Sequence, residues 1–168
     1  YILFFSMAGI FLSEFLLIRI LWQRFFPALP KWMLRLSIAL AGLANPALWL
    51  LTQPKLHEAA IAAAQFFFIS GLLAAILALG RPYASRSGLL ILAGTLWALA
   101  VGTRLVMVFP VVFMTVMVIY WFFKNHGRAL LKALTGLIPL GVPLFVGAAS
   151  LAWYNWARFD SVFEFGLT

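Results

Sequence analysis

The sequence contains no cysteine, which excludes a disulfide, a cysteine nucleophile and a metal site built on thiolates. Acidic residues are also scarce, because only four Asp and Glu stand against twelve Lys and Arg. The two histidines, His57 and His126, lie far apart and belong to no HxxxH or HExxH pattern. We therefore expect no metal site and no cofactor site made by this segment alone, and whether a divalent metal takes part stays open.

Charge of either sign is rare, at 10% of residues, whereas 65% are hydrophobic and 17% are aromatic. Such a chain cannot cover a water-facing surface with polar side chains, so it belongs in a lipid bilayer. Its apolar runs are separated by short basic clusters, without a long polar linker. We predict an all-α fold, a polytopic transmembrane helix bundle of about six spans that forms a single transmembrane domain over residues 1–168.

The expected spans follow the apolar runs. The first ends near Trp22, the second extends from about Trp32 to Thr52, and the third ends near Leu79. The last span is expected to bend at Pro139 and Pro143.

The run from Gly88 to Phe123 contains a single charge, Arg104. As one helix it would be roughly 54 Å long at about 1.5 Å per residue, against a hydrocarbon core of about 30 Å. It must therefore form two spans. We place the hairpin turn at Gly102–Arg104, where a cation can reach the membrane interface.

Six alternating spans put most of the cations on one side of the membrane, which the positive-inside rule identifies as cytoplasmic. These cations are Arg19, Arg24, Lys31, Arg35, Arg81, Arg86, Lys124, Arg128 and Lys132. The net charge of +8 then reflects topology and anionic headgroups, and we expect no nucleic-acid partner.

The opposite, external side collects a mixture of charges. Its members are Lys55, His57, Glu58, Arg104, Arg158, Asp160 and Glu164. Each one alone is compatible with simple solvation at the interface, but their convergence on one side favours a functional site. The adjacent His57 and Glu58, in the stretch QPKLHEAAI, stand at the start of a span.

Three stretches carry a resemblance to a known family. They are NPALWLLTQPKLHEAAIAAAQFFFISGLLAAIL, LLILAGTLWALAVGTRLVMVFP and YNWARFDSVFEFGLT. Together they resemble the GT-C superfamily of polyprenyl-phosphate-dependent membrane glycosyltransferases, especially bacterial relatives of protein O-mannosyltransferases and aminoarabinose transferases. The third stretch is similar to the family signature Asn-x-x-Arg-Phe-Gly-Ser-x-x-Glu-Phe-Gly, with Asp160 in place of the first glycine.

The resemblance implies an enzyme that transfers a sugar from a polyprenyl-phosphate donor to an acceptor glycan, lipid or protein. The reaction would take place on the external face of the bacterial cytoplasmic membrane. Glu58 is then a supporting catalytic acid, and the substrate-binding candidates are His57, Arg104, Lys55, Arg158 and Glu164.

The family's principal catalytic aspartate lies in the first external loop. The chain begins at Tyr1 without a methionine, so we expect an internal fragment of a longer protein, with the main base upstream.

Two alternative functions remain at this point, and the second of them, a purely structural membrane subunit, has no sequence feature that favours it. A multi-pass transporter or flippase of a lipid or solute would also use bent helices and membrane-level charges, and Asn45-Pro46, Pro139 and Pro143 suit it equally well. Arg104 itself could merely anchor its turn against lipid phosphate, or pair with Glu58 or Glu164.

Overall fold

A computed structural model describes residues 2–44, 56–126 and 130–162, and these ranges are almost entirely helical. The elements in order are α1 (Ile2–Phe25), α2 (Lys31–Ala44), α4 (Leu56–Leu79), α5 (Tyr83–Thr103), the short 3-10 helix η1 (Leu105–Met107), α6 (Val108–His126) and α7 (Leu130–Phe159). All of them except α2 contribute to the five helical stretches of the described residues that are long and apolar enough to cross a membrane, and η1 together with α6 forms one of these stretches. The prediction of an all-α, multi-pass membrane bundle is confirmed.

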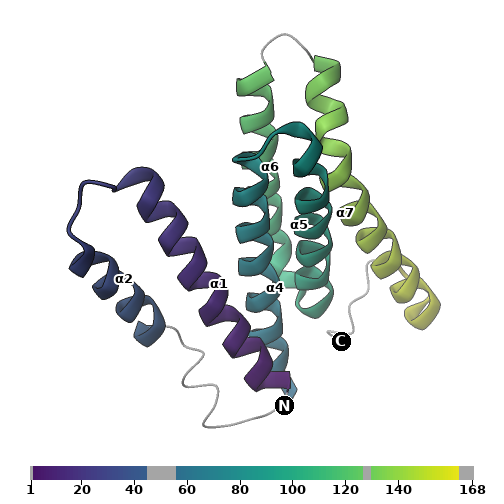
Figure 1. Ribbon diagram of the computed structural model, residues 1–168. Helices are drawn as coiled ribbons and strands as arrows, with labels where there is room; N and C mark the ends of the chain where they lie inside the picture. Colours follow the sequence, from purple (N-terminus) through teal and green to yellow (C-terminus); the bar gives the residue numbers. More distant parts are fainter. Residues whose placement is uncertain (1, 45–55, 127–129, 163–168) are drawn as a thin grey trace.

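The helix α2 differs from the expected second span. It has 14 residues, about 21 Å of helix at the usual rise, and runs back along α1 after the turn between Pro27 and Pro30 (Figure 1). The rest of that expected span, with Asn45-Pro46 and Trp49, lies outside the described residues.

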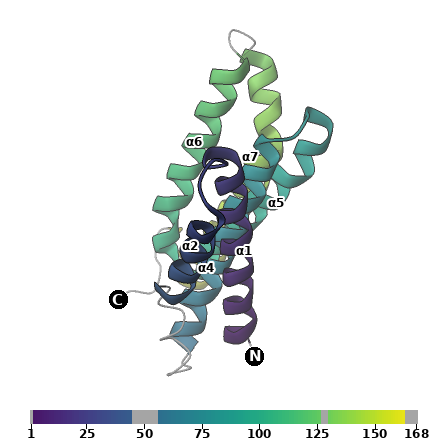
Figure 2. The same ribbon diagram turned by 60° about the vertical axis from the view of Figure 1, so that its left-hand side comes forward.

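Successive helices run in opposite directions, so the connections gather at the two ends of the bundle (Figures 1 and 2). The α1–α2 and α4–α5 connections lie at one end, with Arg24 in the last turn of α1 and Arg81 between α4 and α5. Arg104, between α5 and η1, and Arg158, in the last turn of α7, lie at the other end. The predicted separation of the charges is confirmed for these residues, and the assignment of the first end to the cytoplasm stays a prediction.

The core lies among α4, α5, α6 and α7, where small residues allow the helices to approach closely. On α5, a Cβ at Gly94 would come 2.6 Å from the main-chain oxygen of Leu140 on α7. On the other side of the bundle, α1 packs on α4 with the ring of Phe66 against Gly9, and the Ser13 and Ser70 hydroxyls lie 2.9 Å apart. In a bilayer, such close approach supplies the packing energy that the hydrophobic effect cannot.

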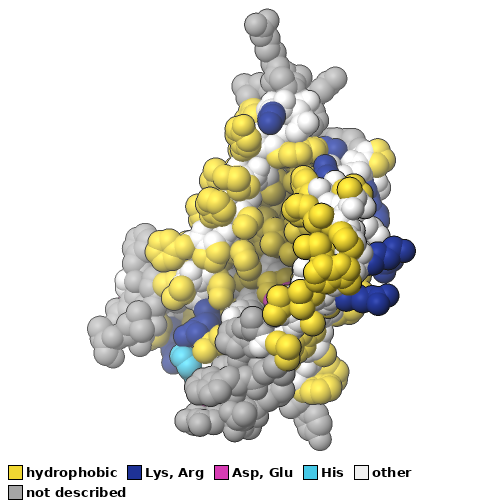
Figure 3. Space-filling view, turned by 90° about the vertical axis from the view of Figure 1, so that its left-hand side faces the viewer, with side chains coloured by type: hydrophobic (Ala, Val, Ile, Leu, Met, Phe, Trp, Pro, Cys, Tyr) yellow, Lys and Arg dark blue, Asp and Glu magenta, His cyan; other side chains and the backbone are white. Residues whose placement is uncertain are grey.

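Large apolar side chains cover the outside of the bundle. Phe109 is 78% exposed and Phe145 is 74% exposed. Figure 3 shows hydrophobic side chains over most of one face, with Lys and Arg toward its edges. A surface of this kind is stable against lipid tails and unstable in water.

Both prolines of α7 lie inside one continuous helix, and α7 changes direction along its length (Figure 1). Each proline lacks the N–H that an α-helix needs at that position, which weakens the helix locally. The predicted bend in the last span is confirmed.

Candidate functional site

The turn between α5 and α6 forms where it was predicted. The helix α5 ends at Thr103, and Arg104 takes an extended conformation, with φ −149° and ψ 117°. The Arg104 N–H donates to the Ala100 carbonyl at 3.1 Å, and its own carbonyl accepts from the Met107 N–H at 2.9 Å. The Thr103 hydroxyl donates to the Ala100 carbonyl at 2.8 Å, so the end of α5 is well ordered by hydrogen bonds.

This turn brings Arg104 to the first turn of α4. The Nη2 atom of Arg104 lies 3.2 Å from Nε2 of His57. A guanidinium group only donates, so in this hydrogen bond Nε2 of His57 is the acceptor. His57 is exposed, and both Arg104 and the neighbouring Glu58 are half-buried. The structure thus joins three of the predicted site residues at one end of the bundle.

The register between α4 and α5 explains why these residues meet. Trp97 on α5 is fully buried, and its Nε1 donates to the Phe68 carbonyl on α4 at 3.2 Å. From that contact, His57 lies about 16 Å along α4 and Arg104 about 10 Å along the antiparallel α5, at the usual rise per residue. The extended backbone and long side chain of Arg104 make up the difference between these two lengths, so its guanidinium reaches His57.

The charges of the site come from Arg104 and Glu58, which have opposite signs. A guanidinium carries about five N–H donors in a planar fork, more than its hydrogen bond to His57 uses. Glu58 lies in the first turn of α4, where a carboxylate is stabilised by the helix dipole. The site therefore combines a half-buried guanidinium, an imidazole and a carboxylate where the end of α5 meets the start of α4.

An apolar groove of about 270 Å³ lies between α5, α6 and α7. Its lining residues are Ala98, Val101, Val108, Val111, Val112, Thr115, Val116, Leu144 and Ala148. The hydroxyl of Thr115 donates to the Val111 carbonyl at 2.8 Å, so it presents little polarity to the groove. Val101 and Val108 flank the turn at Arg104 in the sequence, so the groove begins near that turn and suits a hydrocarbon chain.

Arg158 lies at the same end of the bundle but interacts within its own helix end. Its Nη1 donates to the Tyr154 hydroxyl at 2.7 Å, and its guanidinium lies 5.1 Å from the centre of the Phe159 ring. These contacts hold Arg158 on α7 and do not bring it to His57 and Arg104. Lys55 and Glu164 lie outside the described residues.

Asn155 was not among the predicted site residues, although it is 3% exposed and organises the end of α7. Its Nδ2 donates to the Val162 carbonyl at 3.3 Å, which folds the chain back after the helix. Asp160 ends the helix with φ 54°, and its N–H donates to the Trp156 carbonyl at 2.9 Å. The sequence did contain a signal for this turn. The resembled signature has glycine at position 160, and glycine is the residue that the left-handed conformation of Asp160 favours.

Among the described residues, no group of three or more His, Cys, Asp or Glu side chains could hold a metal ion. No protein-family model, no curated protein and no solved structure matches the chain.

Proposed function

We propose that this chain is part of an integral membrane glycosyltransferase, which moves a sugar from a polyprenyl-phosphate donor to an acceptor glycan, lipid or protein. Transfer takes place at the end of the bundle that carries the α5–α6 turn, which we assign to the external face of the cytoplasmic membrane. The observation that supports this proposal most is the pairing of Arg104 with His57 beside an apolar groove.

Arg104 is the residue that would bind the head of the donor. At the bilayer centre an arginine would cost roughly 2.5–3.5 kcal/mol on insertion scales, and a place at the turn lets Arg104 avoid this cost by reaching the headgroup level. The contact with His57 orients the guanidinium at the helix ends. A guanidinium in that position matches two oxygens of a phosphate group, which is the head of the donor.

The apolar groove would hold the tail of the donor. A polyprenyl chain is a long branched hydrocarbon that stays in the bilayer while its phosphate lies at the interface. The groove between α5, α6 and α7 is lined by valine and alanine together with Thr115 and Leu144, and it begins near the turn that holds Arg104. One donor molecule would thus place its head on Arg104 and its first isoprene units in the groove.

In the reaction, an acceptor hydroxyl oxygen forms a bond to the anomeric carbon of the sugar, and the bond from that carbon to the phosphate oxygen breaks. The hydroxyl proton goes to a carboxylate base, and the electron pair leaves with the phosphate. Arg104 stabilises the negative charge on the leaving phosphate, and His57 holds the guanidinium in place. Glu58 supports the acceptor, while the principal base belongs to a part of the protein outside this segment.

The test uses the full-length protein and a polyprenyl-phosphate sugar. Arg104→Ala should weaken donor binding by about 1.5–3 kcal/mol, the scale of a hydrogen bond to a charged group, and Arg104→Lys should retain part of the affinity. Arg81→Ala is the matched control, since it removes a cation from the opposite end of the bundle. Wild-type donor affinity in Arg104→Ala, with only a lower melting temperature, would make Arg104 a structural anchor.

Glu58 has its own test. Glu58→Gln keeps the shape of the side chain and removes its charge, so turnover should fall at least about tenfold at unchanged expression. A carboxylate that only favours the helix dipole contributes about 0.3–1 kcal/mol of stability and leaves turnover near that of the wild type.

The bend of α7 at Pro139 and Pro143 favours a second candidate, a multi-pass transporter or flippase of a lipid or solute. Reconstituted liposomes separate the two functions. Release of polyprenyl phosphate without movement of the donor between leaflets supports the transferase, and movement of the donor without release supports the flippase.

A further inference from the structure

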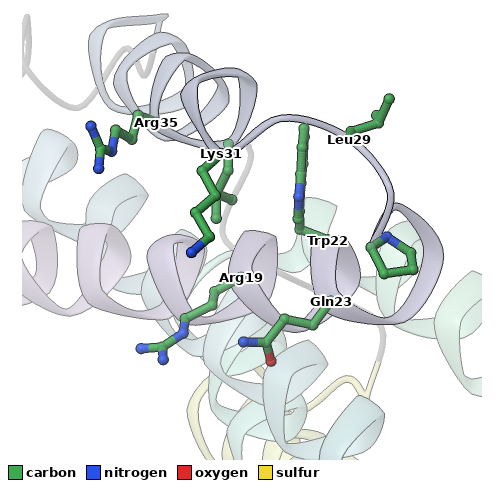
Figure 4. A pocket seen from close by; sticks show the side chains of 8 residues that line it. Arg19, Trp22, Gln23, Leu29, Lys31 and Arg35 are labelled. Atoms are coloured by element: carbon green, nitrogen blue, oxygen red, sulfur yellow. The ribbon is translucent and has the colours of Figure 1, made fainter.

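A second site is present at the other end of the bundle, where α1 turns back into α2. A pocket of about 500 Å³ opens between these helices. Its lining residues are Arg19, Trp22, Gln23, Pro27, Leu29, Lys31, Leu34 and Arg35. In Figure 4, Lys31 reaches from α2 toward the part of α1 that carries Arg19, and Trp22 rises from α1 toward the connecting segment.

The charge of this pocket has one sign. Arg19, Lys31 and Arg35 supply three cations, and no carboxylate is among its lining residues. Lys31 and Arg35 are also one helical turn apart on α2, where like charges repel each other. An anion bound between the two helices would remove this repulsion and form charge-assisted hydrogen bonds with both.

The remaining walls are apolar. Trp22, Leu29 and Leu34 line the same pocket as the cations. Tryptophan is characteristic of the headgroup level of a membrane, where its ring meets lipid and its N–H meets water. The helix α2 also exposes Leu36, Leu40 and Leu43, so the surroundings of the pocket are suited to acyl chains. A ligand that fits both the cationic and the apolar walls of the pocket has a phosphate head and a hydrocarbon body.

We propose that this pocket binds the phosphate headgroup of an anionic membrane lipid and that the bound lipid joins α2 to α1. Basic pockets between transmembrane helices are known to hold headgroups that carry more than one phosphate, and cardiolipin is the probe that we choose. The two phosphates would lie against Arg19 on α1 and against Lys31 and Arg35 on α2. This site is separate from the proposed transferase site and does not depend on it, since the two occupy opposite ends of the bundle.

The test measures cardiolipin binding to the full chain in phosphatidylcholine nanodiscs, by native mass spectrometry across a cardiolipin titration. The variant Arg19→Gln with Arg35→Gln should bind cardiolipin about tenfold to thirtyfold more weakly, as expected when two cations are removed from an anionic headgroup. The control is Arg24→Gln with Arg81→Gln, which removes the same charge from the same end of the bundle outside the pocket. It should change the affinity by less than about twofold. An equal loss in both variants would mean diffuse attraction and would overturn the proposal.

A second measurement locates the lipid without removing any charge. Because the chain has no cysteine, Leu29→Cys places a single thiol in the pocket, and Ala28→Cys places one beside it. Cardiolipin should slow maleimide labelling of Leu29→Cys and leave Ala28→Cys unchanged. The lack of protection at Leu29→Cys would overturn the site.

Inorganic pyrophosphate distinguishes a lipid headgroup from a soluble phosphate in the same labelling experiment, because it has two phosphates and no acyl chains. If the pocket binds a membrane lipid, pyrophosphate should hardly slow the maleimide labelling of Leu29→Cys at concentrations where cardiolipin protects the thiol fully. Equal protection by both would show that the pocket recognises soluble phosphates, and the assignment to a membrane lipid would then be wrong.

Discussion

Gly71 on α4 lies directly against the indole of Trp97 on α5, so that a Cβ at position 71 would be 2.5 Å from Cδ1 and 2.6 Å from Nε1 of the indole. The missing side chain leaves the space in which Trp97 is buried and donates to the Phe68 carbonyl. Because this contact sets the register of α4 against α5, it also determines that His57 meets Arg104 at the end of the two helices.

The first prediction is that Gly71→Ala destabilises the protein by about 1–3 kcal/mol, the usual cost of overpacking a core. The added methyl group would displace the indole and weaken its hydrogen bond to Phe68. Reversible unfolding in mixed micelles, followed by tryptophan fluorescence, measures the change in unfolding free energy.

Gly88→Ala is the matched control for this prediction. Gly88 also lies inside α5, but a Cβ there would meet nothing within 4 Å. Alanine is the better helix former by roughly 0.5–1 kcal/mol, so this variant should be as stable as the wild type or more stable. If both substitutions had the same effect, steric crowding at Trp97 would not be the cause.

The second prediction concerns the hydrogen bond between Ser13 on α1 and Ser70 on α4, whose hydroxyl oxygens are 2.9 Å apart. A double-mutant cycle of Ser13→Ala and Ser70→Ala should give a coupling energy of about 0.6 kcal/mol, and at most about 1.7 kcal/mol, as found for hydrogen bonds between membrane helices. Ser13→Ala combined with Ser37→Ala is the additive control, because the Ser37 hydroxyl donates within α2 to the Met33 carbonyl. Zero coupling between Ser13 and Ser70 would contradict the contact.

The third prediction concerns the left-handed residue that ends α7. Asp160 has φ 54°, so Asp160→Gly should stabilise the protein by up to about 1 kcal/mol. Asp160→Val should destabilise it by about 1–2 kcal/mol, because a β-branched side chain is strained in this region. Melting temperatures of the two variants measured side by side should lie on opposite sides of the wild-type value. A lower melting temperature for Asp160→Gly would contradict the assigned conformation.

The fourth prediction concerns which end of the bundle faces outward. Val106 is 68% exposed at the α5–α6 turn, and Arg81 is exposed at the other end. In intact cells, Val106→Cys should react with a membrane-impermeant maleimide, and Arg81→Cys should react only after permeabilisation. Lys55→Cys should behave like Val106→Cys. The reverse pattern would move the proposed transferase site to the cytoplasmic face.

Several features of the fold were predictable from the sequence because they depend on local composition and on the thickness of a bilayer. The run from Gly88 to Phe123 is too long for one crossing, and its only charge marks the place where it turns, which is Arg104 in the structure. The separation of the basic clusters from Arg104 and Arg158 follows in the same way from alternating spans. The extent of α2 was less predictable. A span from about Trp32 to Thr52 was expected, whereas the helix in the described part of the chain has 14 residues and ends at Ala44.

Sequence alone determined that this protein is a bundle of membrane helices and that Arg104 lies at a turn between two of them, because both follow from hydrophobicity counted along the chain. Only the tertiary structure decided that His57, 47 positions away, is the partner of Arg104, and that Arg19 on α1 shares a pocket with Lys31 and Arg35 on α2. Such pairings depend on the register and rotation of neighbouring helices. Those are set by close contacts such as Gly71 against Trp97, which no periodic pattern along a single helix contains.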